Sequence, residues 1–168
     1  ALVKYLLAAE TLGSVTVICT DKTGTITEGV MITRKIYVWD KEIEVAGGYT
    51  LSGKFYLDGK EIKPMNDPLL SKLLKVGTLC TNVFIGDEIT GDPTELAIAI
   101  AAAKAGFHKS GLEKMHPRVH EIPFSSERKM MSTINRYDKN RFIVCTKGAP
   151  EIILDRCRYI EIDDGELI

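Results

Sequence analysis

The junction between an apolar run and a polar loop near the start of the chain constrains the fold most. The β-branched run Val15–Thr20 ends directly in the string DKTGT at positions 21–25. Such a run predicts a buried strand, and open α/β sheets place their ligands at the carboxyl ends of strands. A carboxylate, a lysine, two threonine hydroxyls and a flexible glycine suit phosphoryl transfer, with Asp21 as a covalent nucleophile. The alternative is an ordinary strand followed by a polar glycine turn.

Composition limits the class of protein. The chain has 168 residues, of which 45% are hydrophobic and 27% charged, and its net charge is -1. These values are ordinary for a soluble globular protein, and the charge balance argues against nucleic acid as a partner. No uninterrupted apolar run approaches the roughly 18 residues that span a bilayer. The four cysteines form no CxxC pair, so we expect reduced and mostly buried thiols.

The remainder of the chain alternates short β runs with helices. An aspartate before a proline is a favoured start of a helix, and this pair occurs at Asp67 and at Asp92. An Asp-Gly pair at 58–59 predicts a hairpin turn. We expect helices at 1–13, from 67 onward, at 94–105 and at 149–157. Strands are expected at 32–39, 42–45, 54–57, 61–62, 118–123, 130–136, 142–146 and 159–162. The pattern predicts an α+β body with a twisted antiparallel sheet flanked by helical hairpins, and a domain boundary near 27–31.

Three further segments bring anion-binding and base-binding groups into this body. GDPTE at 91–95 places Glu95 in the first turn of a helix, PFSSERK at 123–129 sets the aromatic Phe124 before two cations, and KGAPE at 147–151 puts a lysine at a strand end. An aromatic ring can stack on a base, while lysines and helix starts attract phosphates. Taken singly, each segment is also typical of a routine helix start, a core phenylalanine beside a charged turn, or a strand-to-helix turn.

In this order after DKTGT, the segments resemble those of the P-type ion-pumping ATPases. The forms GDPTE, PFSSERK and KGAPE are similar to those of the type II, calcium-pump-like branch. The resemblance implies that residues 1–28 begin a haloacid-dehalogenase-like phosphorylation domain with its first helix, strand and loop. Residues 29–168 are then a nucleotide-binding domain that is truncated at its C-terminal end. Because the sheet flanking the strand at 15–20 is absent, we expect residues 1–28 to pack poorly.

The resemblance also implies roles for the loop residues. Asp21 is expected to be the phosphorylated nucleophile, and its carboxylate and the backbone carbonyl of Thr23 to hold Mg²⁺. Thr23 and Thr25 are expected to contact the γ-phosphate, with Lys22 belonging to the same catalytic loop.

In the nucleotide-binding domain, the resemblance implies that Phe124 stacks on adenine. Lys129 and Lys147 are expected to line the pocket, and Glu95 to bond to the adenosine or to a pocket cation. The nucleotide-binding set is completed by Thr94 and Gly148.

The implied function is the ATP-binding and phosphorylation-motif part of a cation pump that forms an aspartyl phosphate, with calcium as the leading ion. ATP and Mg²⁺ are the expected cofactors. The expected partners are the remaining phosphorylation, actuator and transmembrane domains of the same pump, and an open sheet edge can also pair two copies. The part itself is expected to be soluble, as a cytoplasmic domain of an integral membrane protein.

Two alternatives stay open. The chain can be an ATP-binding module without turnover, since the hinge lysine and the acidic Mg²⁺ motif of the family are missing from it. It can also be a haloacid-dehalogenase-like phosphatase. Those enzymes usually carry a second aspartate as general acid and base where this chain has Thr23, which disfavours the phosphatase.

Overall fold

The computed structural model describes residues 13–162 and Gly165. The chain divides into two units, Ala1–Val30 and Met31–Ile168. The expected helix over 1–13 lies outside the described residues, apart from Gly13 at its end. No helix of the described residues has the length and apolar character needed to cross a bilayer.

In the first unit, the expected strand over 15–20 is not formed. The side chains of Val17 and Ile18 are 73% and 82% exposed, which agrees with the expectation that this segment packs poorly. A strand is stable only when a neighbouring strand pairs its backbone N–H and C=O groups. The described residues of this unit supply no such neighbour. The β-branched composition was therefore insufficient, and the strand prediction was wrong.

The loop that follows does fold back on itself. The carbonyl of Lys22 accepts hydrogen bonds from the amides of Ile26 at 3.0 Å and Thr27 at 3.1 Å. Gly24 has a φ of +79°, which only glycine adopts readily. The result is a tight turn over 22–27.

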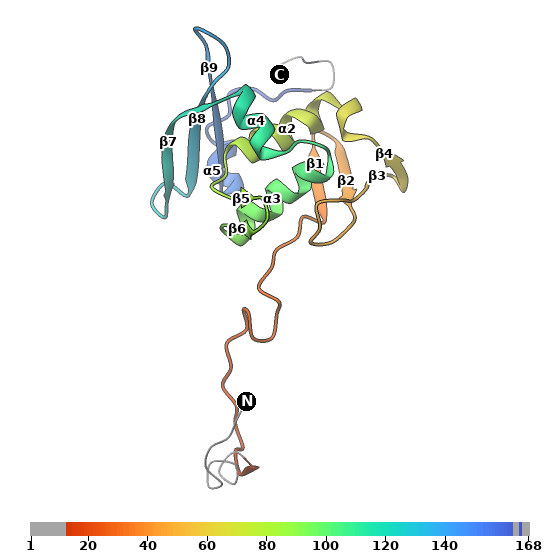
Figure 1. Ribbon diagram of the computed structural model, residues 1–168, viewed down its shortest axis with the longest axis vertical. Coiled ribbons are helices and arrows are strands. Elements are labelled where there is room, and N and C mark those ends of the chain that lie inside the picture. The colour runs from red at the N-terminus through yellow and green to blue at the C-terminus, as the bar shows by residue number, and fades with distance from the viewer. Residues whose placement is uncertain (1–12, 163–164, 166–168) are drawn as a thin grey trace. The chain divides into compact units, whose positions relative to one another are not determined.

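The second unit is α+β, and the strands of its described residues form three separate antiparallel sheets rather than the one sheet expected (Figure 1). The first sheet has the order β1-β2-β3-β4, and its turn at Asp58-Gly59 has positive φ at both residues, as a type I′ hairpin requires. Its strands are β1 (Lys35–Val38), β2 (Lys41–Val45), β3 (Phe55–Leu57) and β4 (Lys60–Ile62).

The other two sheets differ in size. One is a short pair of strands that the sequence did not predict, β5 (Phe84–Ile85) and β6 (Ile89–Thr90). The other has the order β7-β8-β9 and comprises β7 (Arg118–Ser125), β8 (Met130–Arg136) and β9 (Phe142–Gly148). The strand expected at 159–162 is not formed. Glu161 makes an isolated bridge there, and its neighbours are not part of a strand.

Both helices that were predicted from Asp-Pro pairs are present. The Asp67 carboxylate accepts from the amide of Leu70 at 2.9 Å, and the Asp92 carboxylate accepts from the amides of Thr94 at 2.9 Å and Glu95 at 3.3 Å. Each aspartate thus satisfies donors that a helix start leaves unpaired. The helical elements are η1 (Pro64–Asn66), α2 (Pro68–Leu79), α3 (Pro93–Lys104), α4 (Lys109–Met115) and α5 (Pro150–Leu154). The sequence did not predict α4, and α5 is shorter than expected.

The core lies where α2 and α3 pack between the four-stranded and the three-stranded sheets (Figure 1). Leu70 and Leu74 of α2 meet Phe55 from one sheet and Met131 from the other, and all four are buried. The alanines of α3 allow close packing of the helix. Cys80 and Cys145 are buried in this core, whereas Cys19 and Cys157 are exposed, so the expectation of mostly buried thiols was wrong for two of four.

Candidate functional site

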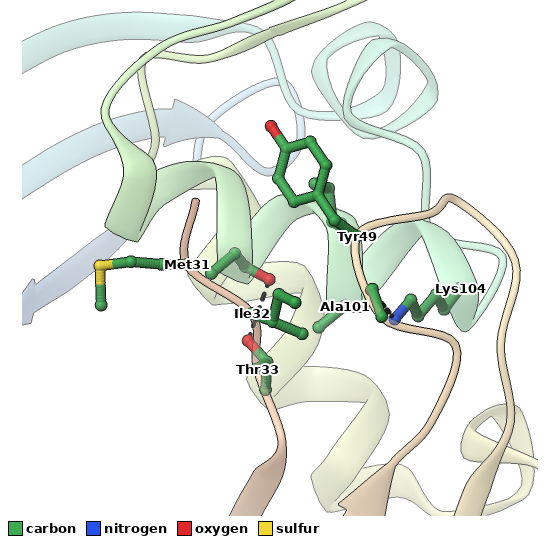
Figure 2. A pocket seen from close by; sticks show the side chains of 9 residues that line it. Met31, Ile32, Thr33, Tyr49, Ala101 and Lys104 are labelled. Carbon is green, nitrogen blue, oxygen red and sulfur yellow. Dashed lines mark hydrogen bonds between the residues drawn. The ribbon is translucent and has the colours of Figure 1, made fainter. Parts of the chain in front are cut away.

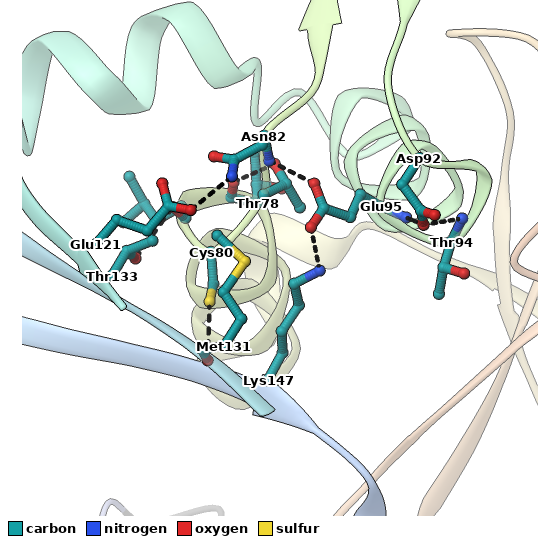
Figure 3. A network of polar contacts seen from close by, with 12 residues as sticks. Thr78, Cys80, Asn82, Asp92, Thr94, Glu95, Glu121, Met131, Thr133 and Lys147 are labelled. Carbon is teal, nitrogen blue, oxygen red and sulfur yellow. Dashed lines mark hydrogen bonds and ion pairs between the residues drawn. The ribbon is translucent and has the colours of Figure 1, made fainter. Parts of the chain in front are cut away.

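An ion pair joins two of the predicted site residues. Glu95 lies in the first turn of α3 and Lys147 near the end of β9, and the Lys147 Nζ donates to Glu95 Oε1 at 2.6 Å (Figure 3). The two side chains are only 12% and 25% exposed. The second carboxylate oxygen, Oε2, accepts from the backbone amide of Asn82. Both oxygens of Glu95 are therefore held by groups from different elements.

Phe124 lies in a β-bulge of β7. The pairing runs from Ile122 opposite Ser132 to Ser125 opposite Met130, so Pro123 and Phe124 together face the single residue Met131. Bulges re-aim side chains, and proline suits a bulge because it has no N–H to pair. The Phe124 side chain is 61% exposed. This exposure contradicts the alternative that Phe124 is a core residue.

The turn between β7 and β8 fixes the backbone at Lys129. This residue has a φ of +52°, and its amide donates to the carbonyl of Ser125 at 2.7 Å. Its carbonyl accepts from the amide of Ala149 at 3.0 Å. The Lys129 side chain is exposed, so its ammonium is free to meet an anion.

Gly148 is required by the close approach of β9 to this turn. A Cβ at this position would lie 2.4 Å from the carbonyl oxygen of Lys129 and 2.5 Å from the Cβ of Met130, closer than real side chains approach. The glycine of KGAPE thus allows two strands and a turn to meet.

Strand register brings the predicted nucleotide-binding residues to one end of the three-stranded sheet. Lys147 pairs with Met131, the residue opposite the bulge that carries Phe124. Gly148 pairs with Met130, next to Lys129. Glu95 reaches this end from α3, and the exposed Thr94 precedes it. Asp21, Lys22, Thr23 and Thr25 are exposed in the first unit.

Two hollows in the described part of the second unit lie elsewhere. One is lined by Met31–Thr33, Tyr49 and α3, and is too narrow to hold a water molecule (Figure 2). There Lys104 Nζ donates to the carbonyls of Ala46 at 3.1 Å and Gly48 at 2.6 Å. These two hydrogen bonds hold the loop between β2 and β3 against α3. A second, open groove lies on the four-stranded sheet and is lined by Asp40–Glu42 and Asp58 among others. Neither hollow contains a predicted site residue.

Three residues that support this site belong to none of the sequence motifs. They are Asn82, Arg118 and Glu121, which bond to one another. Figure 3 shows Asn82 between Glu121 and Glu95, and its backbone amide donates to Glu95. An asparagine after a helix is typical of an ordinary turn, so its type and position carried no signal. Among the described residues, no group of three or more His, Cys, Asp or Glu side chains is placed to hold a metal ion.

Comparison with known proteins decides the family. The family model described as "P-type ATPase, cytoplasmic domain N" matches residues 69–168. The chain belongs to the P-type ATPases. A cation-transporting ATPase of Synechocystis sp. is 39% identical over 179 aligned positions, covering 100% of this chain and 20% of that protein. A calcium-transporting ATPase of Bacillus subtilis is 40% identical over 170 positions, covering 97% of this chain and 19% of that protein.

A third relative gives the same picture. The probable cation-transporting ATPase F of Mycobacterium bovis is 40% identical over 174 positions, covering 99% of this chain and 19% of that protein. This P-type ATPase chain therefore spans about a fifth of the length of the curated relatives it matches. The resemblance inferred from DKTGT and the three later motifs is confirmed.

Proposed function

We propose that this chain is the ATP-binding and phosphorylation-motif part of an ATP-driven cation pump, cytoplasmic in an integral membrane protein. The observation that carries the proposal is the exposed Phe124 ring at the same end of the sheet as the largely shielded Glu95–Lys147 pair. Calcium is the leading ion, because relatives that match 97% and 95% of the chain are named calcium-transporting ATPases.

The nucleotide end of the second unit combines stacking and charge. Phe124 supplies an exposed aromatic face, which is suited to an adenine ring. An ammonium has three donor hydrogens, and Lys147 uses one on Glu95. Its remaining donors, with the exposed ammonium of Lys129, suit the phosphates of the nucleotide. Thr94 at the start of α3 and the backbone at Gly148 border the same region.

In the pump, the Asp21 carboxylate is the proposed nucleophile. One of its oxygens bonds to the γ-phosphorus of ATP while the bond from that phosphorus to the β–γ bridging oxygen breaks, and ADP leaves. Lys22, Thr23 and Thr25 stabilise the charge on the transferred phosphoryl oxygens. Because Thr23 replaces the acid and base of a phosphatase, attack of water on the acyl phosphate is slow.

The exposed loop also fits Mg²⁺. This ion prefers oxygen ligands, typically one or two carboxylates together with phosphate oxygens and water. The Asp21 carboxylate and the Thr23 carbonyl are ligands of this kind, and the ion would neutralise phosphate charge. By itself, the chain is proposed to bind ATP without turnover.

Titration calorimetry with ATP and Mg²⁺ tests the nucleotide site. We expect Phe124→Ala to raise the Kd about tenfold, since base stacking contributes about 1–3 kcal/mol. Phe142→Ala is the matched control, because Phe142 is also an exposed strand phenylalanine, at 55%, but lies at the opposite end of β9. Equal effects of the two changes, or none from Phe124→Ala, would contradict the stacking role.

Labelled ATP tests the phosphorylation step separately. The chain with γ-labelled ATP and Mg²⁺ is expected to bind nucleotide and to incorporate no acid-stable phosphate. A longer protein that contains this chain with its pump domains is expected to incorporate phosphate, and Asp21→Asn to abolish it. Phosphate that persists in Asp21→Asn would exclude Asp21 as the nucleophile.

A further inference from the structure

We propose that Asn82 is a positioning residue that orients the Glu95–Lys147 pair for the nucleotide, an inference that rests on the function proposed above. Asn82 lies in the connection between α2 and β5, outside the motifs DKTGT, GDPTE, PFSSERK and KGAPE. Its hydrogen bond to this pair goes to Glu95, which in turn bonds Lys147, so Asn82 acts through Glu95 (Figure 3).

Three hydrogen bonds hold Asn82 in place. Its backbone amide donates to Glu95 Oε2, its Nδ2 donates to Glu121 Oε1 at 2.7 Å, and its Oδ1 accepts from Arg118 Nη1 at 2.5 Å. The side chain thus faces β7 while the amide faces α3. A residue held on one side by two side-chain bonds presents its amide on the other side in a fixed direction.

Arg118 connects this set of hydrogen bonds around Asn82 to the end of α2. Its Nη2 donates to the carbonyls of Leu79 at 3.0 Å and Thr81 at 2.6 Å, and its Nη1 also donates to Glu121 Oε2 at 2.9 Å. A planar guanidinium with donors in a rigid fork joins all these acceptors in one geometry. Since Arg118 and Glu121 belong to β7, the strand that carries Phe124 is tied through Asn82 to the carboxylate of Glu95.

The consequence concerns the ammonium of Lys147. Glu95 has one oxygen on the Asn82 amide and the other on Lys147, so rotation of the carboxylate would break one of the two bonds. If the Asn82 side-chain bonds are removed, the Thr81–Asn82 peptide group keeps its carbonyl bonds but loses two of its ties to β7. The amide can then shift, the carboxylate can follow it, and the ammonium loses its fixed position. Such a displacement weakens nucleotide binding without removing any group that contacts the nucleotide.

A role limited to stabilising the end of α2 is distinguishable from positioning. Thr133 of β8 also bonds the end of α2, since its Oγ1 donates to the carbonyl of Leu79 at 3.2 Å, and this carbonyl belongs to a different peptide group from the Asn82 amide. Thr133→Val is therefore the matched control, because it removes a bond to the end of α2 and leaves the Thr81–Asn82 peptide group and its bond to Glu95 in place.

A double-mutant cycle on the ATP Kd tests the inference. We expect Asn82→Ala to weaken binding about fivefold in the unaltered background, and to have no further effect in Glu95→Gln, because residues that act through one another are non-additive. Thr133→Val is expected to lower the unfolding midpoint and leave the Kd unchanged. Folding of each variant is checked by circular dichroism, and Arg118→Lys, which loses the fork, replaces Asn82→Ala in the cycle if that variant does not fold.

The outcomes separate the two proposals. Absence of ATP binding by the unaltered chain overturns both the proposed function and this inference. ATP binding that Asn82→Ala leaves unchanged, or that it weakens equally in both backgrounds, overturns only the positioning role. An equal loss of affinity in Thr133→Val also overturns it, since general loosening of the end of α2 then accounts for the effect.

Discussion

Glu95 and Lys147 are 52 residues apart in the sequence, yet an ion pair of 2.6 Å joins the start of α3 to the end of β9. The pair is mostly shielded from water. Removing one partner of such a pair leaves a charge that has lost both its solvent and its counter-charge, which costs more than losing an exposed pair.

The first prediction concerns this pair. Lys147→Met is expected to lower the free energy of unfolding by about 1–3 kcal/mol, because Glu95 keeps its charge in a shielded position. The double variant Glu95→Gln with Lys147→Met is expected to cost less than the sum of the single changes. Urea unfolding at pH 7 measures both, and additive costs would show that the pair is not coupled.

The control is a pair that is open to water. Lys35 and Glu42 approach to 2.5 Å on the four-stranded sheet, but their side chains are more than half exposed. Surface ion pairs contribute little to stability because water and salt screen them. Lys35→Met is expected to cause little measurable change in the same assay.

The second prediction compares two glycines. Gly148→Ala is expected to destabilise the fold by about 1–3 kcal/mol, because the added methyl group would meet the Lys129 carbonyl and Met130. At Gly111, in α4, a Cβ meets nothing within 4 Å, so Gly111→Ala is expected to be neutral or stabilising by up to about 1 kcal/mol. Thermal unfolding ranks the two variants, and equal midpoints would contradict the close approach at Gly148.

The third prediction concerns acid stability at Asp67. Burial alone would raise the pKa of this carboxyl, but hydrogen bonds from the amide of Leu70 and from Lys41 outweigh it and hold the pKa below its ordinary value of 3.8. The folded state therefore binds this proton less readily than the unfolded chain. The stabilisation is fully present above pH 3.8 and is lost as the pH falls through the depressed pKa.

Two variants separate charge from capping at this position. Asp67→Ala is expected to lose about 1 kcal/mol at pH 7, because it removes the helix cap. Asp67→Asn keeps a capping oxygen and is expected to flatten the fall in stability below pH 4. Urea midpoints between pH 2 and 7 measure both effects, and an unchanged slope in Asp67→Asn would assign the acid loss to other groups.

The fourth prediction concerns thiol reactivity. Burial raises the pKa of Cys145 to about 11, with a further contribution from the nearby Cys80, and burial raises the pKa of Cys80 as well. Since the thiolate is the reactive form, both are expected to resist a disulfide reagent at pH 8. Cys19 and Cys157 are exposed and are expected to react rapidly. Peptide mass spectrometry after short labelling identifies the modified residues, and rapid labelling of Cys145 would contradict its burial.

Local signals predicted local structure well. The helix starts at Asp67 and Asp92 were found because cap and proline act within one turn, and the hairpin at 58–59 because its turn requires particular residues. Helix α4 was missed because its N-cap, His108, makes no capping bond with its side chain. The prediction of a strand over 15–20 was wrong, because a strand needs a neighbouring strand for its backbone hydrogen bonds and the apolar run does not supply one.

In the candidate site, too, features set by neighbouring residues were predictable and features set by tertiary contacts were not. Motifs pointed to Phe124, Lys129 and Lys147, because each lies within a few residues of a proline or a glycine in the sequence. The sequence did not decide whether Glu95 bonds to the nucleotide or to a cation. Its contact with Lys147 depends on how α3 packs against β9, which no local motif encodes. The contribution of Asn82 depends on three elements at once and leaves no trace in its neighbourhood in the sequence.

The bulge in β7 sets which way the strand faces on either side of it. Ile122 pairs with Ser132 and Ser125 with Met130, so two residues three positions apart lie on the same face of the sheet, where simple alternation would place them on opposite faces. Deleting either Pro123 or Phe124 would restore regular alternation and leave both flanking segments on their present faces. Strands β7 and β8 can therefore pair without the additional residue. The extra residue in β7 determines which side chains the strand presents, not whether the two strands pair.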